Sequence, residues 1–241
     1  MTRLAHLLAL GLLLAGCDAR SADNSGHVVH ESAPASAFPR PHRDVADIVS
    51  DQFSNEDDRD RAGEAEKVMG LLGIKPGMTV ADIGAGNGYY SVRLSQRVGP
   101  QGRVFAEDIM PAYVDRLRGR VEAEGLPNVT VTLGDPHDPK LPTGEADLAL
   151  LMHMYHEVEQ PFGLLWHLHA AMKPGGRVAV ADMNRPTNRH GTPPALLRCE
   201  FAALGYRQTA FHDLGGSSGY LAVFETADPR PSPRAIRPCK G

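Results

Sequence analysis

Short apolar runs alternate with amphipathic stretches through most of the chain after residue 78. The runs are typical of buried strands, and the expected strands are Thr79–Ile83, Arg103–Asp108, Val129–Leu133, Asp147–Met152 and Arg177–Asp182. Stretches with apolar positions at helical spacing separate or follow them, and the expected helices are Tyr89–Val98, Pro111–Glu124, Gln160–Met172 and Pro194–Leu204. Alternating strands and helices predict a parallel sheet with helices on both faces.

Two more strands are expected near the end of the chain, at Tyr206–Phe211 and Tyr220–Glu225. The glycine-rich stretch 215–219 between them indicates a hairpin, which adds an antiparallel strand. Before the first strand, apolar positions at helical spacing predict one helix from Ser54. The predicted fold is therefore α/β, a Rossmann-like doubly wound sheet of seven strands, mostly parallel, with an antiparallel C-terminal hairpin strand. The predicted domain covers residues 54–226.

The most apolar stretch of the chain lies near its first residue. Arg3 precedes an apolar run over residues 4–15, which is short for a membrane span and typical of a secretory signal peptide. The ending Leu14-Ala15-Gly16-Cys17 resembles a bacterial lipobox, in which the chain is cut before a cysteine that then carries lipid. This predicts a signal peptide over residues 1–16 and a lipoprotein held by Cys17 on a membrane surface of the bacterial cell envelope. The alternative is a cytoplasmic protein with a misassigned leader.

Two segments beside the predicted domain lack apolar periodicity. Residues 17–53 are rich in Ser, Ala, Pro and His, and we expect a flexible tether there. Residues 227–241 are rich in Pro and Arg, and we expect a disordered tail. Cys199 and Cys239 either pair in an oxidising compartment or remain one buried and one loose thiol.

Composition excludes several classes of protein. The chain has 241 residues, of which 42% are hydrophobic and 22% charged, so it is neither disordered throughout nor a small disulfide scaffold. Its formal net charge of −4 argues against a nucleic-acid partner, since such proteins usually carry a basic excess. The length predicts one domain with extensions.

The stretch Asp82-Ile83-Gly84-Ala85-Gly86-Asn87-Gly88 joins the first expected strand to the helix after it. Glycines in such a loop let the backbone turn sharply and let a ligand approach closely. A dinucleotide-binding loop favours glycine at the next position, where this chain has Tyr89. The stretch instead resembles motif I of the class I S-adenosylmethionine (SAM) dependent methyltransferases. The resemblance covers roughly Glu56 to Glu225.

Further segments resemble the same family in the family's order, and these are Gly102–Asp108, Gly134-Asp135, Asp147–Met152 and Lys173–Arg177. The resemblance implies that SAM is the cofactor and that it binds beyond the carboxyl ends of the strands. The cofactor contacts that it implies are Asp82, Gly84, Ala85, Gly86, Gly88, Asp108, Asp135 and Met152.

The resemblance also implies a role for each of the acids. Asp108 holds the ribose hydroxyls, because an ionised carboxylate accepts two hydrogen bonds, and Glu107 is the alternative. Asp135 meets the adenine amino group. Asp82 orders the glycine loop and faces the methionine ammonium, whereas Asp147 is better explained as a carboxylate that caps a loop.

Groups that titrate near neutral pH follow the fourth expected strand, in His153-Met154-Tyr155-His156-Glu157. Our hypothesis is that His153 or His156 is a catalytic base, which the reaction needs if the acceptor group is poorly acidic. The alternative is that such a histidine packs against adenine or hydrogen-bonds the loop. The spacing matches neither H-E-x-x-H nor H-x-x-E-H, so no metal site is predicted.

The resemblance is nearest to small-molecule methyltransferases of the quinone-biosynthesis type. The predicted function is SAM-dependent methyl transfer, by in-line displacement, to a small-molecule acceptor, and a membrane-facing site favours a lipid or quinone-like one. The resemblance implies that the loop 184–194 helps to shape the acceptor site. Arg185 and Arg189 in this loop either meet an anionic acceptor or remain solvated. The alternative is a non-catalytic lipoprotein that binds SAM or a nucleoside on the same fold.

Overall fold

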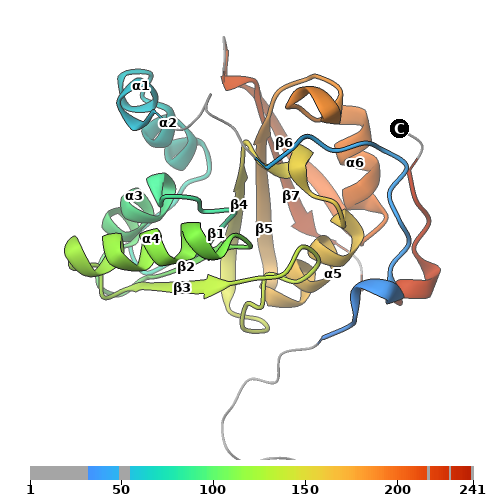
Figure 1. Ribbon diagram of the computed structural model, residues 1–241, viewed down its shortest axis with the longest axis horizontal. Coiled ribbons are helices and arrows are strands. Elements are labelled where there is room, and N and C mark those ends of the chain that lie inside the picture. Colours follow the sequence, from blue (N-terminus) through green and yellow to red (C-terminus); the bar gives the residue numbers. More distant parts are fainter. Residues whose placement is uncertain (1–31, 49–54, 216–217, 228, 240–241) are drawn as a thin grey trace, which may run out of the picture.

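The computed structural model describes residues 32–48, 55–215, 218–227 and 229–239 (Figure 1). Its strands are β1 (Thr79–Ile83), β2 (Arg103–Asp108), β3 (Val129–Leu133), β4 (Ala146–Met152), β5 (Met172–Asp182), β6 (Tyr206–Asp213) and β7 (Tyr220–Thr226). They form a seven-stranded sheet in the order β3-β2-β1-β4-β5-β7-β6. The neighbours from β3 to β5 run parallel, and β7 runs antiparallel to both β5 and β6. This confirms the predicted fold class.

The helices lie on both faces of the sheet (Figure 1). They are α1 (Glu56–Arg61), α2 (Glu64–Leu71), α3 (Tyr89–Val98), α4 (Pro111–Ala123), α5 (Pro161–Ala171) and α6 (Pro194–Ala202). Short 3₁₀ turns are η1 (Ala35–Ala37), η2 (Tyr155–Glu157), η3 (Thr187–Arg189) and η5 (Pro233–Ala235). From β1 to β7, the bounds of the predicted elements are correct to within two residues, except at the start of β5.

Glycines explain the two places where the predicted elements were wrong. The single helix expected from Ser54 is two helices, because Gly63 takes a left-handed conformation with φ +63° between α1 and α2. Residues 173–176, which fall between the expected helix Gln160–Met172 and the expected strand Arg177–Asp182, lie inside β5, which begins at Met172. The register against β4 shifts there, and Gly175 (φ +74°) lets the bulged chain stay in the sheet.

Strand alternation sends apolar side chains to both faces of the sheet. On β1, Ala81 and Ile83 belong to one core cluster and Val80 belongs to the other. The first cluster packs against α5 and α6, and the second packs against α2, α3 and α4 (Figure 1). Covering both faces in this way leaves the strand ends as the place where loops gather.

Residues 32–48, drawn in blue in Figure 1, pack on the α5 and α6 side of the domain. Phe38 is 6% exposed and meets the ring of Trp166 edge-on, with centroids 5.6 Å apart. Arg43 forms an ion pair with Glu200 at 2.9 Å, and both side chains are buried. The prediction of a flexible tether is therefore wrong for residues 32–48. The predicted signal peptide and Cys17 lie outside the described residues.

The last described residues also pack on α5. The guanidinium of Arg230 lies 3.4 Å from the ring centroid of Trp166, and Trp166 Nε1 donates to the carbonyl of Pro231 at 2.9 Å. A disulfide joins Cys239 to Cys199 on α6. The prediction of a disordered tail is wrong for residues 229–239, and the ordered unit exceeds the predicted domain at both ends. Within the described part of the chain, no helix has both the length and the apolar character to cross a bilayer.

Candidate active site

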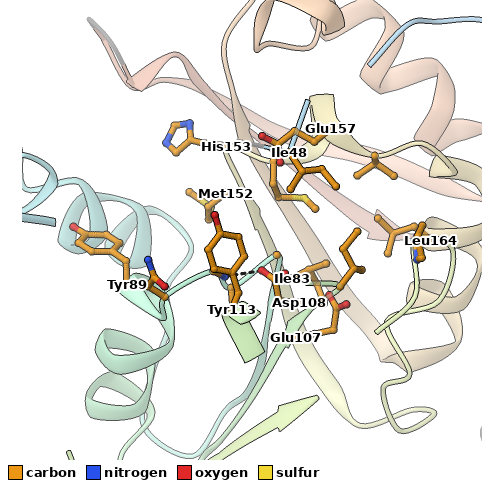
Figure 2. Close-up of a pocket in the computed structure, with 18 of the residues that line it drawn as sticks. Ile48, Ile83, Tyr89, Glu107, Asp108, Tyr113, Met152, His153, Glu157 and Leu164 are labelled. Atoms are coloured by element: carbon orange, nitrogen blue, oxygen red, sulfur yellow. Dashed lines mark hydrogen bonds between the residues drawn. The ribbon is translucent and has the colours of Figure 1, made fainter. Parts of the chain in front are cut away.

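A cavity of about 260 Å³ lies at the carboxyl ends of β1, β2 and β4 (Figure 2). Its volume is many times the roughly 30 Å³ of one water, so it has room for an organic ligand. The strand order reverses direction between β1 and β4, and in open α/β sheets ligands bind at such a switch point. The cavity therefore lies where the sequence placed the cofactor.

The glycine loop forms one wall of this cavity. Gly84, Ala85 and Gly86 all line it, as predicted. Gly88 lies behind the wall, where it begins α3 with φ +89°. A β-carbon at Gly88 would collide with Leu117 of α4, so this glycine serves the close packing of two helices rather than ligand contact.

Asp108 shapes the glycine loop from the end of β2. Its Oδ2 accepts a hydrogen bond from the backbone N–H of Gly86 at 2.8 Å, and its Oδ1 accepts one from Met110 at 2.8 Å. Burial raises the pKa of Asp108, and these backbone donors oppose that rise. Asp108, a predicted cofactor contact, lines the cavity. Both of its carboxylate oxygens accept hydrogen bonds from backbone N–H groups of the protein.

Glu107, which the sequence offered only as an alternative to Asp108, also lines the cavity. Its Oε1 is buried and has no hydrogen-bond partner among the described residues. Burial, with Asp108 next to it, raises the pKa of Glu107 well above its usual value. A β-carbon at Gly134 would collide with this carboxylate, which explains the glycine before Asp135. Glu107 is therefore an acid of the cavity wall with one carboxylate oxygen that no described residue engages.

Asp82 is not among the residues that line the cavity. It is 3% exposed, and its Oδ2 accepts a hydrogen bond from Ser91 Oγ at 2.6 Å. Burial raises the pKa of Asp82 to about 6. This hydrogen bond to the first turn of α3 agrees with the predicted role of Asp82 in ordering the glycine loop. The predicted contact of Asp82 with the methionine ammonium is not supported, because Asp82 does not line the cavity.

Asp135 and Met152 line the cavity from the ends of β3 and β4. Asp135 is half-exposed and pairs with Lys140 Nζ at 2.9 Å. Asp147 lies at the opposite edge of the sheet, where it accepts hydrogen bonds from the backbone of Thr79 and from Lys173 Nζ, each at 2.7 Å. These hydrogen bonds give Asp147 a structural role away from the cavity, in agreement with the expectation from the sequence.

The two candidate bases have separate surroundings. In Figure 2, His153 stands across the cavity from Glu107 and Asp108. His153 Nε2 lies 3.4 Å from Glu64 Oε1. His156 does not line the cavity, because its Nδ1 lies 3.0 Å from Asp182 Oδ1 behind the wall. The prediction that either histidine could face the acceptor is therefore wrong for His156 in this arrangement.

Glu64 anchors His153, and sequence reasoning missed it. Burial alone would raise the pKa of Glu64, but hydrogen bonds from His153 and Arg59 outweigh it and lower the pKa to about 2. Tyr90 donates a third hydrogen bond at 3.0 Å. The sequence held no signal for this network, because Glu64 and Arg59 read as ordinary polar positions of the first helix. Ile48, another missed residue of the cavity wall, lies in the segment that was expected to be a tether.

Acidic side chains outnumber basic ones in the cavity wall. The carboxyl groups that line it are Glu56, Glu107, Asp108, Asp135, Glu157 and Glu159. Among the described lining residues, Arg59 is the one arginine. Its guanidinium carbon lies 3.8 Å from the ring centroid of Tyr89. Burial raises the pKa of Glu157 to about 7. Such a wall favours a cationic ligand.

Comparison with known proteins shows what part of this chain is similar to. Residues 80–176 match the family model described as a methyltransferase domain. That match confirms the methyltransferase domain, with SAM as its cofactor, that the sequence predicted.

Individual relatives agree with the assignment of the domain. The 2-phytyl-1,4-naphtoquinone methyltransferase of Nostoc sp. is 28% identical over 125 residues, which are 52% of this chain and 55% of that protein. The demethylmenaquinone methyltransferase of Geobacillus kaustophilus is 25% identical over 122 residues, 51% of this chain and 52% of that protein. A crystal structure of a SAM dependent methyltransferase from Aquifex aeolicus has a TM-score of 0.61 and 26% identity, over 67% of this chain and 88% of that one. The chain matches about half the length of these two curated relatives.

The cavity of the methyltransferase domain fits SAM. The cofactor carries a sulfonium and an ammonium, which suit a wall rich in carboxylates. Its ribose hydroxyls are donors, and Glu107 Oε1, at the end of β2, is a buried acceptor with no hydrogen-bond partner in the described part of the chain. The backbone of the glycine loop leaves room for close approach at Gly86, where a β-carbon would meet no atom within 4 Å.

Proposed function

We propose that this chain is a SAM-dependent methyltransferase that methylates a small, quinone-like acceptor. The observation that carries the proposal is the acidic cavity at the switch point. Beside the glycine loop that Asp108 holds, Glu107 Oε1 has no hydrogen-bond partner among the residues that the structure describes. The matched family supports it, because that segment includes both acids and the loop.

We assign different parts of the cofactor to different residues of the cavity. Asp108 fixes the loop so that the backbone at Gly86 approaches the ligand, and Glu107 accepts from a ribose hydroxyl. Asp135 lies where an exocyclic amino group would find an acceptor. When bound, SAM supplies the methyl group from its sulfonium. Holding that methyl in line with the acceptor can remove about 7–11 kcal/mol of the barrier.

An apolar side of the cavity suits an aromatic acceptor. Ile48, Met154, Val158 and Leu164 line it together with Met152. Apolar walls with a few polar groups are typical of small-molecule sites. The relatives named for naphtoquinone and demethylmenaquinone substrates support a quinone-like acceptor in this part of the cavity.

We propose His153 as the base for an acceptor that must lose a proton. It follows β4, faces the cavity and is held by Glu64, whose carboxylate stabilises the ring once it gains a proton. His156 is unsuited to this role, because it does not line the cavity.

We further propose that the chain is a lipoprotein of the bacterial cell envelope, anchored to a membrane surface through Cys17. The lipobox-like Leu14-Ala15-Gly16-Cys17 supports this localisation. The disulfide between Cys199 and Cys239 supports it independently, because disulfides persist in oxidising compartments. Metabolic labelling with palmitate tests the proposal: the wild-type chain should take up label and Cys17→Ser should not. Equal labelling of both, or of neither, contradicts it.

The activity is tested by methyl transfer from methyl-labelled SAM to a reduced naphthoquinone without the ring methyl group. We expect the wild-type chain to label the acceptor. We expect His153→Ala to lower kcat by about 10²–10⁴-fold, the contribution of a general base, and to leave SAM affinity nearly unchanged. His212→Ala, on the edge strand β6, is the matched control. Tight SAM binding without transfer to any hydroxylated or reduced quinone would instead support the non-catalytic alternative.

A further inference from the structure

Two histidines and a carboxylate converge beside the methyltransferase cavity. His156 and Glu157 follow β4, and His190 lies in the loop after β5. One nitrogen or oxygen atom from each of the three lies within 4.8 Å of the others. The rings of His156 and His190 meet at right angles, with centroids 5.4 Å apart.

The environment of His156 leaves one ring nitrogen ready to bind a ligand. Asp182 accepts hydrogen bonds from the backbone of Met183 and from Thr192 Oγ1, each at 2.7 Å. Its Oδ1 also lies 3.0 Å from His156 Nδ1. Because a carboxylate can only accept, this nitrogen carries the hydrogen and donates a hydrogen bond to Asp182. The other nitrogen, Nε2, then holds a lone pair.

That lone pair has no hydrogen-bond partner within the described residues, although His156 is only 1% exposed. His156 Nε2 lies 3.8 Å from Glu157 Oε1. The Nδ1 of His190 is also buried, and no described residue forms a hydrogen bond with it. A buried lone pair beside a carboxylate and a second imidazole calls for a cation or a donor between them.

We propose that His156, Glu157 and His190 bind a divalent transition metal ion such as Zn²⁺. Two imidazoles with one carboxylate are donors that such ions prefer. Asp182 supplies the outer carboxylate that commonly orients a metal-binding histidine and fixes its tautomer. Metal–ligand bonds of about 2.0–2.2 Å require Glu157 and His190 to move inward slightly from their present separation.

The sequence-based prediction of no metal site rested on ligand spacing within one segment. This cluster takes His190 from a second loop, which Thr192 ties to Asp182 through its hydroxyl. Because β4 and β5 are neighbours in the sheet, their carboxyl-end loops meet. The spacing of ligands within one segment cannot predict a contact between two loops that are far apart in the sequence.

The position of the cluster indicates what the ion would do. Glu157 belongs both to the cluster and to the cavity wall, so the ion stands at the acceptor side of the methyltransferase cavity. Three protein ligands would leave a position open for an acceptor hydroxyl, whose pKa the ion would lower, or for a carbonyl oxygen, which the ion would polarise. This role rests on the proposed function, whereas the metal site itself does not.

The test uses the full chain after treatment with a chelator. We expect one Zn²⁺ to bind per chain, and we expect Co²⁺ to give visible absorption bands that Zn²⁺ abolishes. His190→Ala and Glu157→Gln should each weaken Zn²⁺ binding at least about tenfold, as should Asp182→Asn, since outer partners contribute about 10–100-fold. His212→Ala is the control and should bind as the wild type does, and circular dichroism should report an unchanged fold for every variant.

Absence of the cobalt bands overturns the proposal, and so does wild-type Zn²⁺ affinity in both His190→Ala and Glu157→Gln. SAM is titrated into the same chelated chain. SAM binding without Zn²⁺ binding removes the metal site and leaves the proposed function standing. Zn²⁺ binding that depends on His190, without SAM binding, supports the metal site and contradicts the proposed function.

Discussion

The carboxylate of Asp108 accepts a hydrogen bond from the backbone N–H of Gly86 at 2.8 Å (Figure 2). This bond joins the end of β2 to the glycine loop that follows β1. The second oxygen of Asp108 holds the backbone of Met110, at the start of α4. One side chain thus sets the positions of two segments around the cavity.

Replacing Asp108 by Asn should weaken SAM binding by roughly 10–100-fold, because a hydrogen bond to a charged group contributes about 1.5–3 kcal/mol. The amide keeps the shape of the side chain but loses the charge, and one of its two oxygens. Calorimetric titration of SAM measures the change. Asp115→Asn, an exposed acid on α4, is the control. Equal affinity in Asp108→Asn and in the wild type would show that the loop needs no such anchor.

Gly88→Ala should destabilise the fold without removing any group from the cavity. Left-handed backbone costs a side-chain-bearing residue about 1–2 kcal/mol, and overpacking against Leu117 adds about 1–3 kcal/mol. The free energy of unfolding should therefore fall by about 2–5 kcal/mol in urea titrations. Gly119→Ala on α4, where a β-carbon meets nothing within 4 Å, is the matched control. Similar stability for both variants would contradict this reading of Gly88.

The sequence was sufficient to predict the sheet, because alternation and turn residues are local properties. Val80 and Ala81 of β1 already indicate two buried faces, and the structure places them in the two core clusters. The glycine loop and the acids after β1, β2 and β3 could be located in the same way, since parallel strands end at one edge. For the ribose hydroxyls, the sequence favoured Asp108 and offered Glu107 as the alternative.

Side-chain partners that come from distant segments could not be predicted. The contact of His153 with Glu64 depends on how α2 packs beside β4, and no periodicity encodes it. The order of residues 32–48 depends on Phe38 reaching Trp166, a contact between segments far apart in sequence. Low apolar periodicity therefore indicated a tether where a few apolar residues suffice to hold the chain.

The disulfide should stabilise the fold through the C-terminal segment. Its cysteines are separated by 40 residues, and closing a loop of that size contributes about 2–4 kcal/mol. The double variant Cys199→Ser with Cys239→Ser should lose that much free energy of unfolding in urea. Wild-type protein kept in reductant is the companion sample and should unfold with the variant. If the oxidised wild type unfolds at the same urea concentration as both, the bond does not restrain the unfolded chain.

Glu64 should make stability depend on pH in the acid range. Its pKa is about 2 in the folded protein, against an ordinary 4.5, so its stabilising effect is complete above 4.5 and is lost as the pH falls towards 2. The difference in free energy of unfolding between the wild type and Glu64→Gln should therefore be larger at pH 6 than at about pH 3. Chemical denaturation at the two values measures it. A difference that is the same at both values would contradict the lowered pKa.

The most direct test of the central claim is a crystal structure of the full chain with S-adenosylhomocysteine, the demethylated product of SAM. We expect density for the ligand at the carboxyl ends of β1 and β2, against Gly84, Ala85 and Gly86. A ribose hydroxyl should lie within hydrogen-bond distance of Glu107 Oε1, a buried acceptor with no partner among the residues described. Density at another place, or ribose hydroxyls that turn away from both Glu107 and Asp108, would contradict the account.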